Sequence, residues 1–268
     1  MKQLFLSIVM GIIQGLTEFL PVSSSGHLVL AKEFLDFKTP DNMSYEIFLH
    51  LGSLIAVLIY FRKDILKIIA SLVNYDKNDS EKRSSIKLLF FLMISTFVTF
   101  ILYLPADDFI EKNFHNPLIA AIMLLLTGLI IFISDFIRKN NIRSSEMGVL
   151  RSILIGVGQS FALLPGISRS GTTISVSLFV NIKRKEAARY SFLLSIPAIL
   201  GAVIFSLDNL TKLTSSEWLF FIAGGVASFI SGFLVIAFLI KMIKKQKLKY
   251  FSFYCWTIAI ISLLVIFL

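Results

Sequence analysis

The sequence predicts an all-α integral membrane protein with six transmembrane helices and two re-entrant helical hairpins. Of its 268 residues, 56% are hydrophobic and only 16% are charged, which is more apolar surface than a soluble domain of this size can bury. Six apolar runs are long enough to cross a bilayer. Two further hydrophobic segments are interrupted in the middle by proline and glycine, so they are predicted to enter the membrane without crossing it.

The first interrupted segment, residues 1–35, opens with MKQLFLSIVMGIIQGLTEFLPVSSSGH. It starts like a signal peptide, but it then carries glutamine, glutamate and proline and has no small-x-small cleavage pattern, so we expect it to be retained. Pro21 and Gly26 break the segment and predict a hairpin. Irregular backbone at membrane depth is tolerated only where protein or a water-filled cavity surrounds it, so we expect this break to line a cavity.

Six full spans follow from the apolar runs of about 17 to 25 residues that a bilayer requires. We expect them near residues 45–61, 88–105, 117–137, 190–207, 218–240 and 250–268. The second interrupted segment, residues 147–182, lies between the third and the fourth of these spans. Pro165, Gly166 and Gly171 break it, so it is predicted to form the second re-entrant hairpin.

The positive charges predict which loops face the cytoplasm, because lysine and arginine accumulate in cytoplasmic loops. Loops 62–87, 138–151, 183–189 and 241–249 hold 7, 4, 4 and 5 of the 26 lysines and arginines. These loops share one face only if each hairpin returns to its own side, and both termini then lie outside the cell. The opposite face keeps few positive residues, namely Lys2, Lys32, Lys38, Lys112 and Lys212.

This topology divides a single membrane domain, residues 1–268, into repeats of opposite orientation at residues 1–146 and 147–268. Each repeat has a re-entrant hairpin followed by three spans. The hairpins also share a pattern, because GIIQGLTEFLPVSSSG (11–26) and GVGQSFALLPGISRSG (156–171) both run from Gly-x-x-Gln through a proline to Ser-Gly. Inverted repeats with broken helices place their site near the midplane, so we expect the two breaks to face each other.

A site at this meeting point is expected to contain a buried charge pair. Arg169 lies at the turn of the second hairpin, and an unpaired charge in hydrocarbon is costly, so it requires a partner. Glu18 lies deep in an apolar segment beside the other break, and Gln14 shares its helical face. The breaks also supply hydroxyl and imidazole groups, from Ser23, Ser24, Ser25, His27, Ser168, Ser170, Thr172 and Thr173.

These side chains suit a phosphate ester. Arginine binds phosphate oxygens through two N–H groups, and hydroxyls with backbone N–H groups at the start of a half-helix complete an anion site. Glu18 is suited to hold a divalent cation that bridges diphosphate oxygens, or to act as a base. His27 is suited to relay a proton, and Ser24 to attack or to donate to the transferred group.

The motifs QGLTEFLPVSSSGH and LPGISRSGTT, with the whole hydropathy layout, resemble the bacterial undecaprenyl-diphosphate phosphatases known from bacitracin resistance. The likeness covers essentially the full length. It implies hydrolysis of the long isoprenoid diphosphate to its monophosphate, which recycles the lipid carrier for peptidoglycan and other cell-wall polymers. It also implies a plasma-membrane location, an active site open to the outer face, and a divalent cation, Mg²⁺ or Ca²⁺, as cofactor.

The resemblance implies the partners as well. They are undecaprenyl diphosphate as substrate and membrane lipids, with bacitracin competing for the substrate and a homodimer as a candidate assembly. Carried over residue by residue, the likeness assigns catalytic roles to Glu18, Ser24, His27 and Arg169. Gln14 and Glu18 are the implied metal ligands, although family members with glutamate at the first position have two carboxylates. The substrate-binding set is Gln14, Ser23, Ser25, Ser168, Ser170, Thr172 and Thr173.

Other functions remain as alternatives. A secondary transporter or flippase of an anionic or lipid-phosphate substrate is the strongest, because transporters also use inverted repeats and broken helices. The acid-phosphatase-like lipid phosphatases fit less well, since no Lys-x6-Arg-Pro precedes SSGH and no histidine follows SR within SRSGTTISVSLF. A purely structural membrane protein would leave Glu18 and Arg169 unexplained.

Composition excludes several kinds of chemistry. The single cysteine, Cys255, excludes disulfides, cysteine-based zinc sites and iron–sulfur clusters. The net charge of +9 does not indicate nucleic acid, because the basic residues flank apolar runs and orient membrane helices. His50 lies within the first full span, where a buried polar contact is favoured over catalysis. Any one of the serines and threonines is about as well suited to capping a broken helix as to binding substrate.

Overall fold

The computed structural model is all-helical throughout the part of the chain that it describes, residues 2–35, 37, 42–138, 140–205 and 215–268. β-Pairing in these residues is limited to one isolated parallel bridge between Ile142 and Ile182. The first half of the chain forms α1 (Lys2–Phe19), α2 (Ser24–Leu35), α3 (Asn42–Tyr60), α4 (Arg62–Val73), α5 (Ser80–Tyr103), η1 (Leu104–Ala106), α6 (Asp107–Asn113) and α7 (Pro117–Asp135). The second half forms η2 (Ser144–Glu146), α8 (Gly148–Phe161), α9 (Arg169–Phe179), α10 (Arg184–Phe205), α12 (Ser215–Lys244) and α13 (Lys249–Phe267).

Within the described residues, length and composition allow five helices to cross a membrane, and a sixth span if one bent pair is counted. The five are α5 with its extension to Ile110, α7, α10, α12 and α13. The bent pair is α3 with α4, whose axes meet at 72°. The five helices overlap five of the predicted runs, and α3 overlaps the run predicted at 45–61, while α4 lies in the segment 62–87 that was predicted to be a loop. Residues 206 and 207 of the fourth run lie outside the described part of the chain, as do Lys38 and Lys212.

Both interrupted segments form pairs of shorter helices. The first segment gives α1 and α2, of 18 and 12 residues, and the second gives α8 and α9, of 14 and 11 residues. At about 1.5 Å per residue, α2, α8 and α9 are each shorter than the hydrocarbon core of roughly 30 Å. None of these three helices is therefore long enough to span a bilayer by itself.

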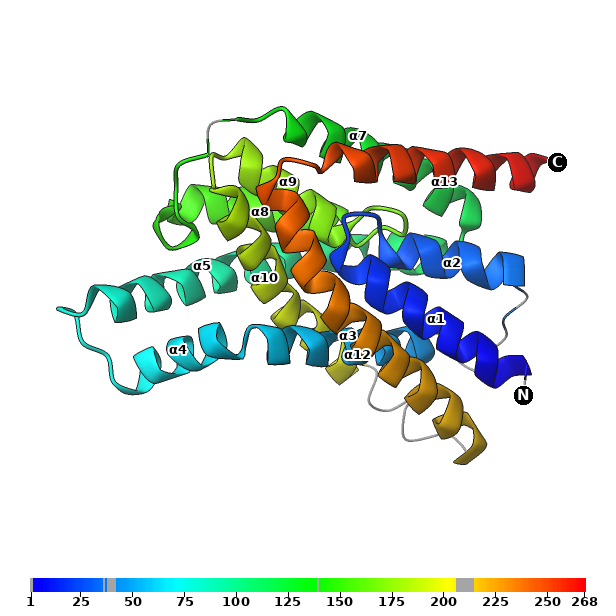
Figure 1. Cartoon of the computed structure of the whole chain (residues 1–268), viewed down its shortest axis with the longest axis horizontal. Coiled ribbons are helices and arrows are strands. Elements are labelled where there is room, and N and C mark those ends of the chain that lie inside the picture. The colour runs from blue at the N-terminus through cyan, green and yellow to red at the C-terminus, as the bar shows by residue number, and fades with distance from the viewer. Residues whose placement is uncertain (1, 36, 38–41, 139, 206–214) are drawn as a thin grey trace.

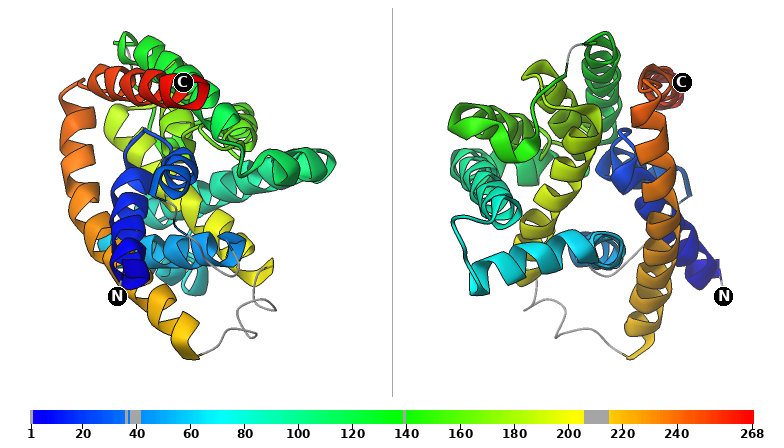
Figure 2. Two further views of the ribbon diagram at one scale, coloured as in Figure 1. Left: turned by 90° about the vertical axis from the view of Figure 1, so that its right-hand side faces the viewer. Right: turned by 60° about the vertical axis from the view of Figure 1, so that its left-hand side comes forward.

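Helices of the two halves are interleaved. Helix α1 packs along α12, and α8 packs along α5, so each interrupted segment lies against a long helix of the other half of the chain (Figures 1 and 2). The α1–α12 contact depends on small residues, because a Cβ added at Gly11 or Gly15 would overlap backbone atoms of α12. Thus α1 lies closer to α12 than larger side chains would allow.

Helices α7 and α13 form a second contact between the halves. They lie side by side in Figures 1 and 2, and the Trp256 indole of α13 donates to the Leu125 carbonyl of α7 at 3.0 Å. Gly128 leaves room for the indole, since a Cβ there would clash with it. This packing joins the last long helix of the first half to the last helix of the second half.

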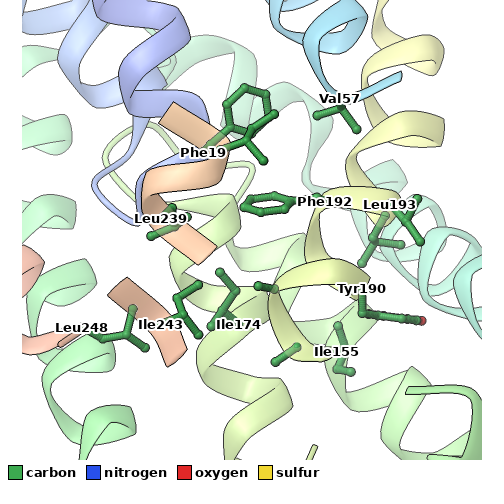
Figure 3. Close-up of a cluster of buried hydrophobic side chains, with 14 of the residues drawn as sticks. Phe19, Val57, Ile155, Ile174, Tyr190, Phe192, Leu193, Leu239, Ile243 and Leu248 are labelled. Atoms are coloured by element: carbon green, nitrogen blue, oxygen red, sulfur yellow. The ribbon is translucent and has the colours of Figure 1, made fainter. Parts of the chain in front are cut away.

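The largest cluster of buried hydrophobic side chains in the described residues lies between helices of the two halves, directly beside the two breaks. Phe19 at the end of α1 meets Phe192 of α10 edge to face, with ring centroids 5.6 Å apart. Figure 3 shows side chains from α3, α8, α9 and α12 converging on this pair. Because Phe19 follows Glu18 directly, the apolar cluster holds the last turn of α1 in position.

The two marked chain ends lie at the same end of the long axis of the molecule (Figure 1). The connections from α4 to α5 and from α7 to α8 lie toward the opposite end (Figure 1). The basic loop between α4 and α5 is thus well separated from the termini. In this loop, Asp79 caps α5. Its carboxyl accepts hydrogen bonds from the N–H groups of Lys82 and Glu81, and these bonds lower the pKa of that carboxyl.

Candidate active site

The two breaks meet. The backbones approach closely at Gly26 and Gly166, where a Cβ on Gly26 would lie 2.9 Å from the Gly166 Cα. A hydrogen bond also joins the hairpins, because the Ser170 hydroxyl donates to the Leu20 carbonyl at 3.0 Å. The expectation that the interrupted segments face each other is therefore confirmed at the level of atomic contacts.

A residue with a positive φ angle turns the chain at each of the two breaks. Ser23 has a φ of 68° and Gly166 a φ of 91°, and both precede a half-helix. Serine rarely adopts this conformation, so strain at Ser23 is maintained by its surroundings. At Gly166 a Cβ would overlap the Ala120 carbonyl oxygen, so glycine is required there.

Each half-helix begins with a serine cap. The Ser23 hydroxyl accepts the N–H of Gly26 at 3.2 Å, and the Ser168 hydroxyl accepts the N–H of Gly171 at 3.0 Å. These bonds start α2 and α9 at equivalent points of the two motifs. The N–H groups of the first two residues of each helix precede the intrahelical ladder and are not used by these caps. Such N–H groups are the donors that bind anions at the start of a helix.

Thr127 of α7 fixes the second break from outside the hairpin. Its hydroxyl donates to the Gly166 carbonyl at 2.8 Å and accepts the N–H of Ser168 at 3.0 Å. A buried side chain from a full span thus holds the backbone immediately before Arg169. The sequence analysis did not single out Thr127, because nothing in its local pattern indicates a partner about forty residues away.

Glu18 is the centre of the site. The residue is 6% exposed, and its carboxylate accepts from the Ser24 hydroxyl at 2.6 Å and the Gln14 amide at 3.0 Å. The Arg169 guanidinium lies on the other carboxylate oxygen, with Nη2 to Oε1 at 2.6 Å. The partner predicted for Arg169 is therefore found across 151 positions of sequence.

Arg169 is also held by the neighbouring span. Its Nη1 donates to the Ser191 carbonyl of α10 at 2.9 Å. Thr173, one turn further along α9, shares a hydroxyl contact of 2.6 Å with the Ser191 side chain. The guanidinium is therefore held by both Glu18 and the Ser191 carbonyl. Thr173 contacts Ser191 and not Glu18.

His27 lies on the first turn of α2, but its bonds lead away from Glu18. Its Nδ1 is 2.7 Å from the Ser23 carbonyl, and its Nε2 is 2.9 Å from the Tyr254 hydroxyl. The imidazole is stacked on the Tyr254 ring with an angle of 3° between the planes. Tyr254 belongs to the last helix, and no motif in the sequence indicated it.

The remaining predicted hydroxyls line the two breaks. The hydroxyl oxygens of Ser23 and Ser25 are 3.3 Å apart. In the second hairpin, the hydroxyl oxygens of Ser168 and Ser170 are also 3.3 Å apart. Thr172 is buried, and its hydroxyl has no partner among the described residues. Thus the serines are used in part as caps, as the sequence analysis allowed, while Thr172 retains a free polar group.

His50, for which the sequence favoured a buried polar contact over catalysis, also lies at the site. Its Nε2 lies 3.3 Å from the second Glu18 oxygen, and its Nδ1 lies 2.7 Å from the Glu46 carbonyl one turn earlier in α3. The expected polar contact exists, but it is with the central carboxylate. The position of His50 in an apolar span was the available signal, and sequence alone could not identify its partner.

The fit of a divalent cation depends on Gln14 and Glu18. The Gln14 Oε1 atom is buried, without a partner among the described residues, and belongs to the amide that bonds Glu18. An unpaired amide oxygen beside a carboxylate suits a hard cation. Over the described part of the chain, however, no group of three or more His, Cys, Asp or Glu could hold a metal ion. The residues therefore fit a cation that takes its other ligands from substrate oxygens and water.

This arrangement combines three chemical capacities. Arg169 and the capped half-helices supply positive charge and N–H donors for an anion. Ser24 offers a hydroxyl already bonded to a carboxylate, which is the pairing of a nucleophile with a base. The site is buried among packed helices, so electrostatic interactions within it are screened less than in water.

Comparison with known proteins identifies the family of this chain. The family model for the bacitracin resistance protein BacA matches residues 7–261. The chain is 39% identical over 260 residues to undecaprenyl-diphosphatase 1 of Shouchella clausii, covering 95% of this chain and 94% of that protein. It is 40% identical over 264 residues to the undecaprenyl-diphosphatase of Halothermothrix orenii, covering 98% of each. The corresponding protein of Methanobrevibacter smithii is 38% identical over 264 residues, with 95% of each covered. The chain belongs to the bacitracin resistance protein BacA family.

Proposed function

We propose that this protein hydrolyses undecaprenyl diphosphate to undecaprenyl phosphate and inorganic phosphate. The relatives that it matches along nearly their whole length are named undecaprenyl-diphosphatases. The observation that carries the proposal is the contact of Glu18 with both Arg169 and Ser24, because it joins an anion-binding group to a paired hydroxyl. The reaction regenerates the monophosphate lipid carrier for cell-wall synthesis and confers resistance to bacitracin, which competes for the diphosphate.

Arg169 binds the diphosphate in this proposal. Its guanidinium matches phosphate oxygens, and the first turns of α2 and α9 add backbone N–H groups. The hydroxyls of Ser23, Ser25, Ser168, Ser170 and Thr172 surround the phosphate, while Thr173 supports Arg169 through Ser191. The isoprenoid tail stays in the lipid between the helices.

Ser24 attacks the terminal phosphorus. Its proton passes to Glu18, which already accepts its hydrogen bond at 2.6 Å. The bond from that phosphorus to the bridging oxygen breaks, and undecaprenyl phosphate leaves with the bridging oxygen. Water then hydrolyses the phosphoserine, releasing inorganic phosphate and restoring the Ser24 hydroxyl. Direct attack by water activated by Glu18 is the alternative, and His27 supplies or relays a proton in either case.

In this proposal, Gln14 and Glu18 would hold a divalent cation, Mg²⁺ or Ca²⁺. The supporting observation is the unpaired Gln14 Oε1 beside the carboxylate. When bound, such a cation offsets negative charge on the diphosphate. The role of the protein is to present the two oxygens and to keep Arg169 within reach of the same substrate.

We also propose the topology that the sequence analysis predicted. Two repeats, residues 1–146 and 147–268, have opposite orientations, and each begins with a re-entrant hairpin, at 1–35 and at 147–182. Several features support this arrangement: the short paired helices, the equivalent serine caps, and the packing of each hairpin on a long helix of the other half. The site then opens to the outer face of a bacterial plasma membrane, with both termini outside.

Phosphate release from undecaprenyl diphosphate tests the function. Purified protein in detergent should release inorganic phosphate when Mg²⁺ or Ca²⁺ is present, and release should stop when a chelator is added. A Glu18→Gln variant that elutes and melts like the native protein serves as the matched control. No release by correctly folded protein under any metal condition would remove the proposed enzyme.

The same preparation tests the transporter alternative. Protein reconstituted in vesicles is given a fluorescent polyprenyl phosphate, and its movement between the leaflets is followed. Movement that depends on Arg169, together with absence of phosphate release, would assign the site to transport instead of hydrolysis.

A further inference from the structure

The His27 imidazole is hydrogen-bonded at both ring nitrogens. The Ser23 carbonyl lies 2.7 Å from Nδ1, and the Tyr254 hydroxyl lies 2.9 Å from Nε2. A carbonyl only accepts hydrogen bonds, so Nδ1 donates. A hydroxyl can either donate to Nε2 or accept from it, so the contact with Tyr254 forms whether or not the imidazole is charged.

The ring of Tyr254 constrains the same imidazole. The two ring planes are nearly parallel, at 3°, and their centroids are 5.5 Å apart. Offset stacking of this kind limits the tilt of the imidazole. The two hydrogen bonds limit its rotation. His27 is therefore held in one orientation, with its Nδ1 at the first break and its Nε2 toward the last helix.

Tyr254 is itself held in place by its neighbours on α13. The thiol of the next residue, Cys255, donates to the Pro21 carbonyl at the first break, at 3.8 Å. The Trp256 indole donates to a carbonyl of α7 at 3.0 Å. Helices α2 and α13 both pack on α7. The Tyr254 side chain therefore reaches His27 from a fixed position.

We propose that Tyr254 is a positioning residue that fixes the His27 imidazole at the first break during phosphate transfer. This inference rests on the proposed function, in which His27 supplies or relays a proton. Tyr254 acts through His27 and not on the phosphate. His27 directly follows Gly26, which lies against Gly166 of the other hairpin. A fixed imidazole thus keeps a constant place relative to both breaks.

The contribution of Tyr254 should affect turnover and not substrate binding. Among the described residues, its hydroxyl bonds only His27. The diphosphate is bound in the proposed function by Arg169 and by the hydroxyl and N–H groups of the two breaks. Loss of the Tyr254 hydroxyl should therefore lower kcat and leave KM unchanged.

Tyr254→Phe tests this expectation, because it removes the hydroxyl and keeps the ring. Phosphate release from undecaprenyl diphosphate in detergent with Mg²⁺ should show a kcat lower by about three- to tenfold, the range expected for loss of one hydrogen bond. Tyr254→Leu also removes the stacking and should lower kcat further. In a His27→Ala background, assayed at high enzyme concentration, Tyr254→Phe should have no effect, because no imidazole remains to be held. His27→Leu replaces His27→Ala if the smaller side chain prevents folding.

Chemical labelling of His27 tests the contact without relying on turnover. Diethyl pyrocarbonate acylates an unprotonated imidazole nitrogen. In a neutral His27 that donates from Nδ1, this nitrogen is Nε2, the atom bonded to Tyr254. Peptide mass spectrometry should therefore show faster labelling of His27 in Tyr254→Phe than in the native protein. His115 is exposed in a different part of the chain and should be labelled at the same rate in both proteins.

Tyr250→Phe is the matched control. Tyr250 lies one turn earlier on α13 and is exposed. The ammonium groups of Lys247 and Lys249 lie 6.0 and 5.9 Å from the centre of its ring, away from His27. The same loss of a hydroxyl should leave kcat, KM and the labelling of His27 unchanged there.

Each contrary outcome has a distinct meaning. Native kcat in Tyr254→Phe, an equal loss in the native and His27→Ala backgrounds, or unchanged labelling of His27 would overturn the role of Tyr254. A native rate in His27→Ala would show that the imidazole is not used, which removes this inference and leaves the proposed function intact. Native protein that releases no phosphate, although the labelling of His27 depends on Tyr254, would instead remove the proposed function, and the catalytic role of this contact with it.

Discussion

At the scale of single residues, the buried carboxylate of Glu18 determines how its neighbours behave. Ser24, Gln14 and Arg169 all donate to it, and His50 lies 3.3 Å away. A carboxylate with this many donors is held in one orientation. Substitution of any donor therefore changes the position or charge of the same group, and the effects of such substitutions should not be additive.

Arg169→Ala should lower kcat/KM for undecaprenyl diphosphate by about 150- to 5000-fold, which corresponds to roughly 3 to 5 kcal/mol for loss of one partner of a buried charge pair. Arg169→Lys keeps the charge but cannot bond Ser191 and Glu18 with one planar group, so it should recover only part of the rate. Phosphate release and the melting temperature in detergent are the measurements. Near-native turnover in folded Arg169→Ala would contradict its assignment.

Ser24→Ala should lower phosphate release by about two to four orders of magnitude, the range expected for loss of a positioned catalytic group. Native protein quenched in acid during turnover should yield phosphoserine at position 24 by mass spectrometry. Ser160→Ala is the matched control, because among the described residues that hydroxyl bonds only the Val157 carbonyl of its own helix. If Ser24→Ala retains the native rate, water attacks directly; a phosphohistidine at His27 would reassign the nucleophile.

At the scale of elements, each interrupted segment combines a residue that adopts a positive φ angle with hydrogen bonds that hold the turn. Gly166 permits the turn before α9, and Ser23 performs the equivalent turn before α2 at the cost of strain. Thr127 and the serine caps then hold each turn. The geometry of the site therefore depends on irregular backbone that Thr127 and the two serine caps hold by hydrogen bonds.

Gly166→Ala should destabilise the protein by about 2 to 5 kcal/mol, because it combines an unfavourable positive φ with overlap against the Ala120 carbonyl. Gly148→Ala separates the two causes. Its φ is +79° but nothing lies within 4 Å of the added Cβ, so only the conformational cost of about 1 to 2 kcal/mol should appear. Thermal unfolding in detergent measures both.

Gly201→Ala completes that series. This glycine lies inside α10 with open space around the added Cβ, so alanine should leave stability unchanged or raise it by about 0.5 to 1 kcal/mol. Equal melting temperatures for all three variants would show that steric and backbone constraints at the second break are weaker than the structure indicates.

At the scale of the whole molecule, the halves support each other instead of folding side by side. Each hairpin packs on a long helix of the other half, and α7 pairs with α13 (Figure 2). Glu18 and Arg169 come from different halves, so the site exists only when both are assembled. Replacing the small residues along α1 and α12 with larger ones would therefore separate Glu18 from Arg169 as well as α1 from α12.

Cysteine labelling in intact cells tests the proposed orientation. In a Cys255→Ala background, Lys112→Cys should react with a membrane-impermeant maleimide, because Lys112 lies on the face predicted to be outside. Lys77→Cys should react only after the membrane is opened, since it lies in a basic loop predicted to be cytoplasmic. Both side chains are exposed, so accessibility within the protein does not limit the reaction. The reverse labelling pattern would contradict the topology and an active site on the outer face.

Much of the architecture was predictable from local sequence. Apolar runs of sufficient length predicted the long apolar helices, and proline with glycine predicted both interruptions, because hydrophobicity and backbone freedom are properties of short segments. Glu18 and Arg169 stood out for the same reason, since a charge in an apolar segment is costly wherever the chain goes. The likeness of the two motifs to one family then indicated the chemistry.

The sequence by itself therefore determined the fold class, the two breaks and most of the polar groups that gather there. Only the tertiary structure decided which of those groups touch. It placed His50 on Glu18, turned His27 toward Tyr254, and used Thr127 to hold the second break. These contacts join residues on different helices, and their distances depend on how closely α1, α3, α7 and α9 pack. That closeness is set by the summed packing of many side chains, which no local pattern records.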